Sequence, residues 1–146
     1  MDNTFKKSIK QLYSIHLPDN VANEIIKLGK PIYNYLLIKI DAPSLSEYQI
    51  INLLRILYQM RYYNIEQFIN KIFSFTQDDR INVRSTASLL AICLFRACSC
   101  LTKEFNELNN IPLHRERLIQ LIHNSLAMGL HKSVREQVET FIEKKI

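Results

Sequence analysis

The chain has 146 residues, of which 47% are hydrophobic, and it carries a formal net charge of +5. This length supports one domain whose core needs neither disulfides nor a structural metal, and the apolar content excludes a disordered chain. Only two glycines and four prolines occur, so the sequence lacks the turn residues that β-hairpins and phosphate-binding loops require. We therefore expect a single all-α domain over residues 1–146.

The spacing of apolar residues predicts three helices in the first 40 residues. The first should cover residues 4–16. The second should cover residues 20–28 and end at Gly29, which can adopt the left-handed conformation typical of a helix C-terminus. A third should cover residues 31–40, because Pro31 lacks only an N–H group that the first turn of a helix does not use. Their short connections indicate helical hairpins.

Three later helices are predicted from polar residues spaced to cap a helix N-terminus. In each pair the first side chain accepts a hydrogen bond from the backbone N–H of the second residue, and the second side chain accepts one from the backbone N–H of the first. The pairs are Ser44 with Glu47, Asn64 with Gln67, and Ser133 with Glu136. The corresponding helices should cover residues 44–61, 64–75 and 133–144.

Two further helices complete the predicted chain. The helix over residues 80–101 is apolar nearly all round, so it should lie at the centre of the fold. Residues 102–111 are polar and rich in asparagine, and we expect them to be irregular. Residues 112–128 should form a helix that ends at Gly129. The sequence thus predicts about eight helices.

A motif occurs twice, each time as a polar turn followed by a Val-Arg pair. Its two copies are Asp78-Asp79-Arg80-Ile81-Asn82-Val83-Arg84 and His131-Lys132-Ser133-Val134-Arg135. In a helix the Val shares a face with an apolar residue one turn later, while the Arg lies beside the turn. Repeated helical units stack into arrays with an extended surface, which favours a binding protein over an enzyme.

Residues 21–95, and again residues 112–146, resemble HEAT-like helical repeats of the short bacterial type. The resemblance also rests on two hairpins that align with each other, over residues 28–40 and 60–73. It implies an α-solenoid of stacked antiparallel hairpins, of the HEAT or armadillo kind. It further implies a polar ladder between repeats that is built by Asp78, Asp79, Arg84 and Arg135. The unit is shorter than the usual ~40–47 residues, and residues 102–111 interrupt the third repeat.

Residue types that carry catalysis or bind metals are present, but their spacing suits neither. The four histidines form no pair at metal-ligand spacing, and no nucleophile lies in a known catalytic motif. Cys93, Cys98 and Cys100 match neither a disulfide framework nor a zinc site, so we expect reduced thiols in the core. We predict no enzyme activity, no cofactor and no metal.

Basic and tyrosine residues are the candidates for an interaction surface. His114, Arg115 and Arg117 could hold a phosphate at a helix N-terminus, although we interpret them as a solvated first turn. Tyrosines concentrate in the first half, and tyrosine adds contact area with a polar tip at low entropic cost. The candidate interface residues are Tyr33, Tyr35, Tyr58, Tyr62, Tyr63, Lys71, Arg115 and Arg117.

The N-terminal residues lack the apolar core of a signal peptide, and no apolar run is long enough to span a bilayer. We therefore expect a cytoplasmic protein, monomeric or weakly dimeric, without membrane contact. Small HEAT-like proteins of bacteria include immunity proteins, so the resemblance implies a protein that neutralises one toxin partner. A nuclease is among the candidate toxins, although a basic inhibitor suits a basic nuclease cleft poorly.

Nucleic-acid binding is the alternative, since some HEAT-like proteins hold DNA on a basic concave face. It requires that scattered cations converge on one surface, namely Lys71, Arg80, Arg84, Arg96, Arg115, Arg117 and Lys132. An enzyme is the third hypothesis, and it would need a composite site that the sequence does not reveal.

Overall fold

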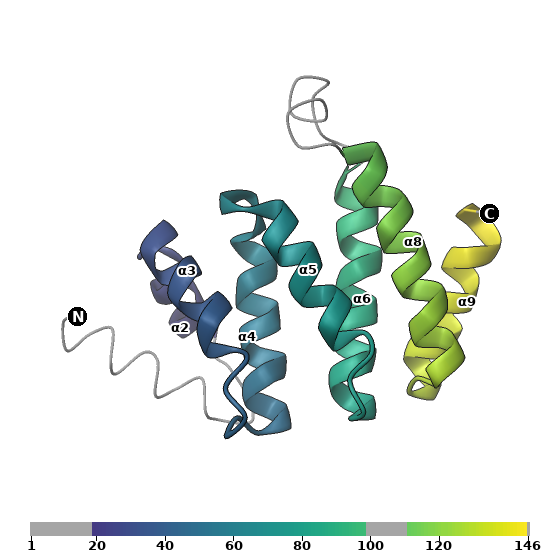
Figure 1. Cartoon of the computed structure of the whole chain (residues 1–146), viewed down its shortest axis with the longest axis horizontal. Helices are drawn as coiled ribbons and strands as arrows, with labels where there is room; N and C mark the ends of the chain where they lie inside the picture. The colour runs from purple at the N-terminus through teal and green to yellow at the C-terminus, as the bar shows by residue number, and fades with distance from the viewer. Residues whose placement is uncertain (1–18, 99–110, 146) are drawn as a thin grey trace. The chain divides into compact units, whose positions relative to one another are not determined.

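The computed structural model describes residues 19–98 and 111–145, and every regular element within them is a helix (Figure 1). The elements are α2 (Asp19–Ile26), α3 (Lys30–Lys39), α4 (Glu47–Gln59), the short 3₁₀ helix η1 (Arg61–Tyr63), α5 (Ile65–Phe75), α6 (Ile81–Cys98), α8 (Ile111–Met128) and α9 (Lys132–Lys145). The all-α prediction is confirmed for this part of the chain. The predictions for residues 4–16, 99–101 and 102–110 lie outside the described residues. The solenoid and the count of eight helices stay predictions.

The chain divides into two compact units, residues 1–64 and 65–146, and each has a core of its own. In the first unit, α2 packs on α3 and α4, which also pack on each other. The apolar stripes of these helices face inward, and the side chains they bury completely include Ile25, Leu36 and Leu54. The described helices of this unit therefore share one core.

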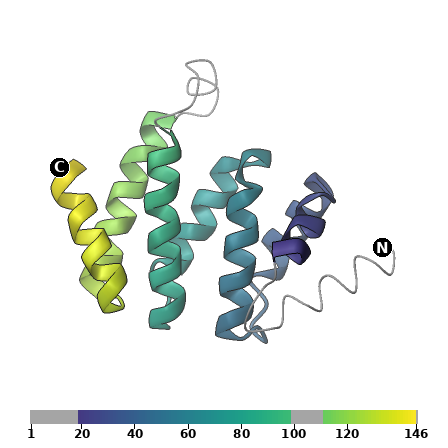
Figure 2. The ribbon, with the colours of Figure 1, turned by 180° about the vertical axis from the view of Figure 1, so that it is seen from behind.

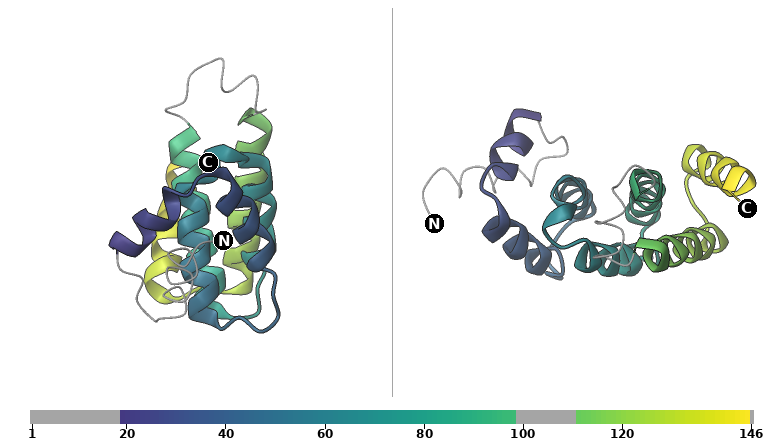
Figure 3. Two further views of the ribbon diagram at one scale, coloured as in Figure 1. Left: turned by 90° about the vertical axis from the view of Figure 1, so that its left-hand side faces the viewer. Right: turned by 90° about the horizontal axis from the view of Figure 1, so that it is seen from above.

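In the second unit, α6 lies at the centre and packs against α5, α8 and α9. The view from above shows two layers, with α6 and α9 in one and α5 and α8 in the other (Figure 3). Because α6 has neighbours on several sides, it buries residues on more than one face, including Val83, Ala87 and Ile92. The central position that its composition predicts is confirmed within this unit.

The N-terminus of α4 has a capping box two residues later than predicted. The Ser46 hydroxyl accepts a hydrogen bond from the Gln49 N–H over 3.3 Å, and the Gln49 side-chain oxygen accepts one from the Ser46 N–H over 2.7 Å. The pairing of Ser44 with Glu47 is therefore wrong. A turn in which the Leu45 N–H donates to the Ala42 carbonyl buries Leu45, so the chain becomes helical only after Ser46.

The predicted cap of the last helix is also displaced. Helix α9 begins at Lys132, so Ser133 lies inside its first turn and does not precede it. The His131 carbonyl already accepts a helical bond from the Arg135 N–H, while the His131 N–H donates to the Ser85 hydroxyl over 3.1 Å. A contact with α6 therefore fixes the start of α9. Gly129 has a φ of 100°, as its position after α8 predicts.

Candidate functional site

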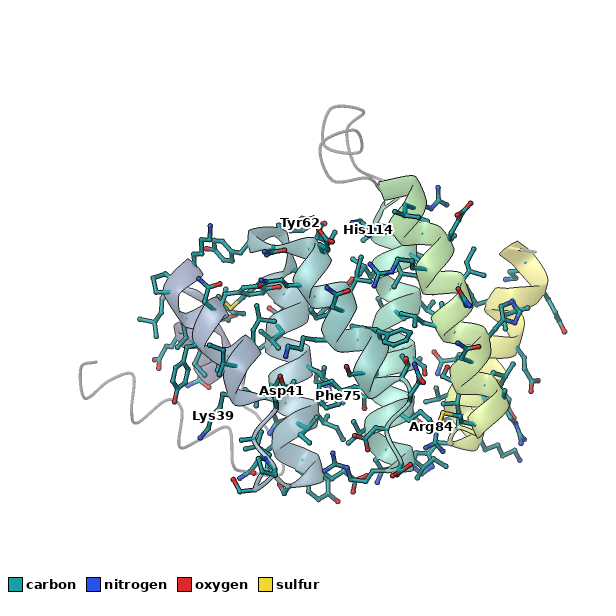
Figure 4. All side chains as sticks on the ribbon, viewed as in Figure 1. Lys39, Asp41, Tyr62, Phe75, Arg84 and His114 are labelled. Carbon is teal, nitrogen blue, oxygen red and sulfur yellow. The ribbon has the colours of Figure 1, made fainter. Side chains whose placement is uncertain are left out.

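Arg84 joins two turns of the second unit through backbone carbonyl groups (Figure 4). Its Nε donates to the Gly129 carbonyl over 2.7 Å, and its Nη1 donates to the Asp78 carbonyl over 2.6 Å. Arg84 is only 7% exposed, so both bonds lie largely away from water. The neighbouring Asn82 adds a side-chain bond to His131. Residues at the start of α6 therefore hold the turn between α5 and α6 against the turn between α8 and α9.

Two other residues of the predicted ladder, Asp78 and Arg135, have local partners. The Asp78 carboxylate accepts hydrogen bonds from the backbone N–H and the guanidinium of Arg80, and the side-chain bond from Arg80 is the main cause that lowers the pKa of Asp78. Asp79 is exposed. Arg135 is exposed and lies 3.8 Å from Glu139, one turn along its own helix. Arg84 and Arg135 therefore occupy equivalent positions in the two copies of the motif but have different surroundings.

In the first unit, a cluster of one arginine and two tyrosines lies where η1 follows α4. The Arg61 guanidinium carbon is 4.2 Å from the centre of the Tyr58 ring and 4.3 Å from that of Tyr62. Its Nη1 donates to the Tyr58 carbonyl over 2.9 Å, and its Nη2 donates to the Tyr62 hydroxyl over 2.8 Å. We call Tyr58, Arg61 and Tyr62 the Arg61 cluster.

The Arg61 cluster is accessible to a partner. Tyr62 is 48% exposed and is labelled beyond the end of α4 in Figure 4, while Tyr58 and Arg61 are half-buried. Both tyrosines are among the predicted interface residues, whereas Arg61 is not. The spacing Tyr58-x-x-Arg61-Tyr62 could have indicated it, because side chains three residues apart meet in a helix.

The remaining tyrosines of the predicted interface differ in exposure. Tyr33 is fully buried, its hydroxyl donates to the Asn64 carbonyl over 3.0 Å, and burial raises the pKa of Tyr33 above its usual range. Tyr33 is therefore a core residue of α3 and was wrongly assigned to a surface. Tyr63 is exposed, with its ring centre 5.9 Å from that of Tyr33, and Tyr35 is half-buried. Tyr63 is thus a further exposed ring on η1 that packs against α3.

The predicted cations Lys71, Arg115 and Arg117 belong to the second unit, so the predicted interface is divided between the two units. Arg117 donates to the side chain of Asn70 over 2.7 Å, which joins α8 to α5. Arg115 lies with its guanidinium carbon 4.5 Å from the centre of the Phe95 ring. Lys71 is half-buried on α5.

The interpretation of the first turn of α8 as a solvated turn is wrong for two of its residues, His114 and Arg115. His114 is 4% exposed, because it lies on the same face as the buried Leu118 one turn later. The Nε of Arg115 is enclosed and has no hydrogen-bond partner. His114 and Arg115 therefore pack against the protein interior.

A groove of ≈ 470 Å³ lies between α6 and α9 of the second unit, on the layer that faces the reader in Figure 2. Its apolar floor includes Ile92, and polar side chains of α9 such as Glu136 form one wall. Cys93 lines this groove and is an exposed free thiol, so its expected place in the core is wrong. Both residues line the groove, but Cys93 is exposed, whereas Ile92 is buried. The side chains of Cys98 and Cys100 lie outside the described part of the chain.

Comparisons with known proteins give no family to which this chain can be assigned. No known protein family, no curated protein and no solved structure matches it. Among the described residues, no group of histidine, cysteine and acidic side chains could hold a metal ion. In the same residues, no helix has the length and apolar character needed to cross a membrane. The resemblance to HEAT-like repeats stays a prediction.

Proposed function

We propose that this protein is a non-enzymatic binding module that engages one protein partner through the Arg61 cluster. The observation that carries the proposal is the contact of one guanidinium with two tyrosine rings, at 4.2 and 4.3 Å, on an accessible part of the first unit. Arginine and tyrosine are the residue types, with tryptophan, that most often dominate the energy of protein interfaces.

The side chain of Arg61 is held in one conformation, which makes the Arg61 cluster better suited to bind a partner. Two hydrogen bonds and two ring contacts restrict Arg61, which as a free side chain would lose much conformational entropy on binding. Tyr63, the next residue of η1, adds another exposed ring, and its ring packs against that of the buried Tyr33. A partner would therefore meet a surface that is already ordered before contact.

The particular role that we propose is neutralisation of a toxin, as the likeness to small HEAT-like immunity proteins implies. An inhibitor of this kind needs a specific and tight surface and no chemistry of its own. A preformed aromatic and arginine surface supports such a role.

The distribution of cations favours a protein partner over nucleic acid. Arg84 is buried and donates to two carbonyl groups, so it is not available to phosphates, and the exposed Arg80 is already paired with Asp78. Arg117 lies with α5 and α8, whereas Arg96 lines the groove between α6 and α9 in the other layer. Nucleic-acid binding through several phosphates needs cations on one surface.

Affinity capture from producing cells tests the proposal when three baits are compared. The wild-type chain and Tyr48→Ala should recover one protein in an equimolar complex, while Tyr62→Ala should recover much less. Tyr48 is the matched control, because it is 46% exposed on α4 and lies at the other end of that helix. If the recovered protein is toxic, co-expression with the wild-type chain should restore growth. Salt-sensitive recovery of DNA or RNA by all three baits, with no protein, would overturn the proposal.

A further inference from the structure

The guanidinium of Arg61 retains hydrogen-bond donors after its internal contacts are made. A guanidinium has five N–H groups, and its bonds to the Tyr58 carbonyl and the Tyr62 hydroxyl use one on Nη1 and one on Nη2. The Nε group is enclosed and has no partner. Each Nη atom therefore keeps one N–H for an external acceptor.

The charge of Arg61 also has no carboxylate partner in the described part of the chain. Its two hydrogen-bond acceptors are a carbonyl and a phenol, both neutral, and within residues 19–98 and 111–145 no carboxylate lies at ion-pair distance from it. Tyrosine rings attract the cation and limit its hydration on their side. A fixed, partly desolvated cation attracts an anion more strongly than a free surface arginine does.

We infer that the Arg61 cluster binds an aspartate or glutamate carboxylate of a protein partner, with apolar atoms around that carboxylate covering the exposed ring of Tyr62. The inference rests on the proposed function and adds the chemistry of the partner's epitope. Each Nη atom can donate one further hydrogen bond, and a carboxylate has two oxygens that can accept them.

A single carboxylate fits this surface better than a nucleic-acid backbone does. The residues next to the cluster in the chain, Gln59, Met60, Tyr63 and Asn64, are all uncharged. The nearest cation in the chain is Arg55, which is exposed on α4, six residues before Arg61. A phosphate backbone is held by several cations in a row, whereas one arginine among aromatic rings is typical of an interface hot spot.

A displayed library of random peptides provides a probe that does not require the natural partner. Peptides are selected on the wild-type chain and are kept only if they fail to bind Tyr62→Ala. We expect the retained peptides to share an aspartate or glutamate. Replacing that residue with its amide should weaken binding to the wild-type chain about tenfold to a hundredfold.

Three further variants separate the role of the charge from that of the fold. Arg61→Gln should bind the acidic peptides more weakly, by the same factor as the amide replacement does in the wild-type chain. Its affinity should not change when the acidic residue of the peptide is replaced by its amide. Arg61→Lys should recover part of the affinity, because it keeps the charge but loses the planar fork. Arg55→Gln is the matched control and should bind as the wild type does. Melting temperatures of all variants must agree for the comparison to hold.

The outcomes distinguish the inference from the proposed function. Peptides that depend on Tyr62 but carry no shared acid, and that bind Arg61→Gln normally, would overturn the carboxylate inference and leave a protein-binding surface. A selection that yields no peptide dependent on Tyr62 would contradict the proposed function together with the inference. Cluster-dependent binding of oligonucleotides, with a steep loss of affinity as salt rises, would select the nucleic-acid alternative.

Discussion

Replacement of Arg84 by alanine should destabilise the second unit strongly. The substitution removes two hydrogen bonds from a charged, buried group to the carbonyls of Asp78 and Gly129. Such bonds contribute about 1.5–3 kcal/mol each, and they are not additive when one side chain makes both. We expect Arg84→Ala to lower the free energy of unfolding by about 3 kcal/mol.

Urea unfolding followed by circular dichroism measures this loss. With a slope of about 1.5 kcal/mol per molar urea, the midpoint should fall by roughly 2 M. Arg84→Lys should lose about half as much, because an ammonium group does not reproduce the planar fork that reaches both carbonyls. The control is Arg135→Ala, whose exposed ion pair with Glu139 is worth less than about 1 kcal/mol. An Arg84→Ala midpoint close to that of Arg135→Ala would refute the bridging role.

Three further predictions concern the described helices. Ser46→Ala should cost about 1 kcal/mol of stability in urea unfolding, whereas Ser44→Ala should be nearly neutral; equal effects would contradict the observed capping box. Because Arg80 lowers the folded-state pKa of Asp78, this carboxylate stabilises the folded state at pH values above its unfolded pKa of about 3.9. That stabilisation is lost as the pH falls through the lower folded-state pKa. Unfolding measured across that acidic window should show a shallower pH dependence in Asp78→Asn, and an unchanged profile would argue against the pair. Cys93 should react with a thiol reagent in the native state and Cys93→Ser should lose that reaction, whereas protection until unfolding would show that the groove is closed.

The helical character of the described segments was readable where apolar periodicity is strong, and the positions of helix ends were less so. The sequence predicts a cap before α4, but Ser44 and Ser46 are chemically equivalent at that point. Burial of Leu45 decides between them, and that is a tertiary contact. The start of α9 is likewise set by a bond from His131 to Ser85, 46 residues away in the chain.

The residues of the candidate site were also hard to predict where their exposure depends on tertiary contacts. Composition drew attention to tyrosines, yet it could not tell that Tyr33 is in the core while Tyr62 is exposed, because an apolar ring with a polar hydroxyl suits both places. Arg61 was overlooked because its partners are rings and a carbonyl, which leave a weaker pattern than a carboxylate pair does. Cys93 lies beside a buried isoleucine in an apolar segment, and only packing of α9 reveals its exposure.

Calorimetric titration of the purified partner against matched single variants tests the proposed binding role most directly. The dissociation constant for Tyr62→Ala should rise by about thirtyfold or more over that of the wild-type chain, which corresponds to about 2 kcal/mol for a residue at the centre of an interface. The constant for Tyr48→Ala, a residue with nearly the same exposure on the same unit, should stay within about twofold of the wild-type value. Equal dissociation constants for the two variants would contradict the assignment of the Arg61 cluster as the binding surface.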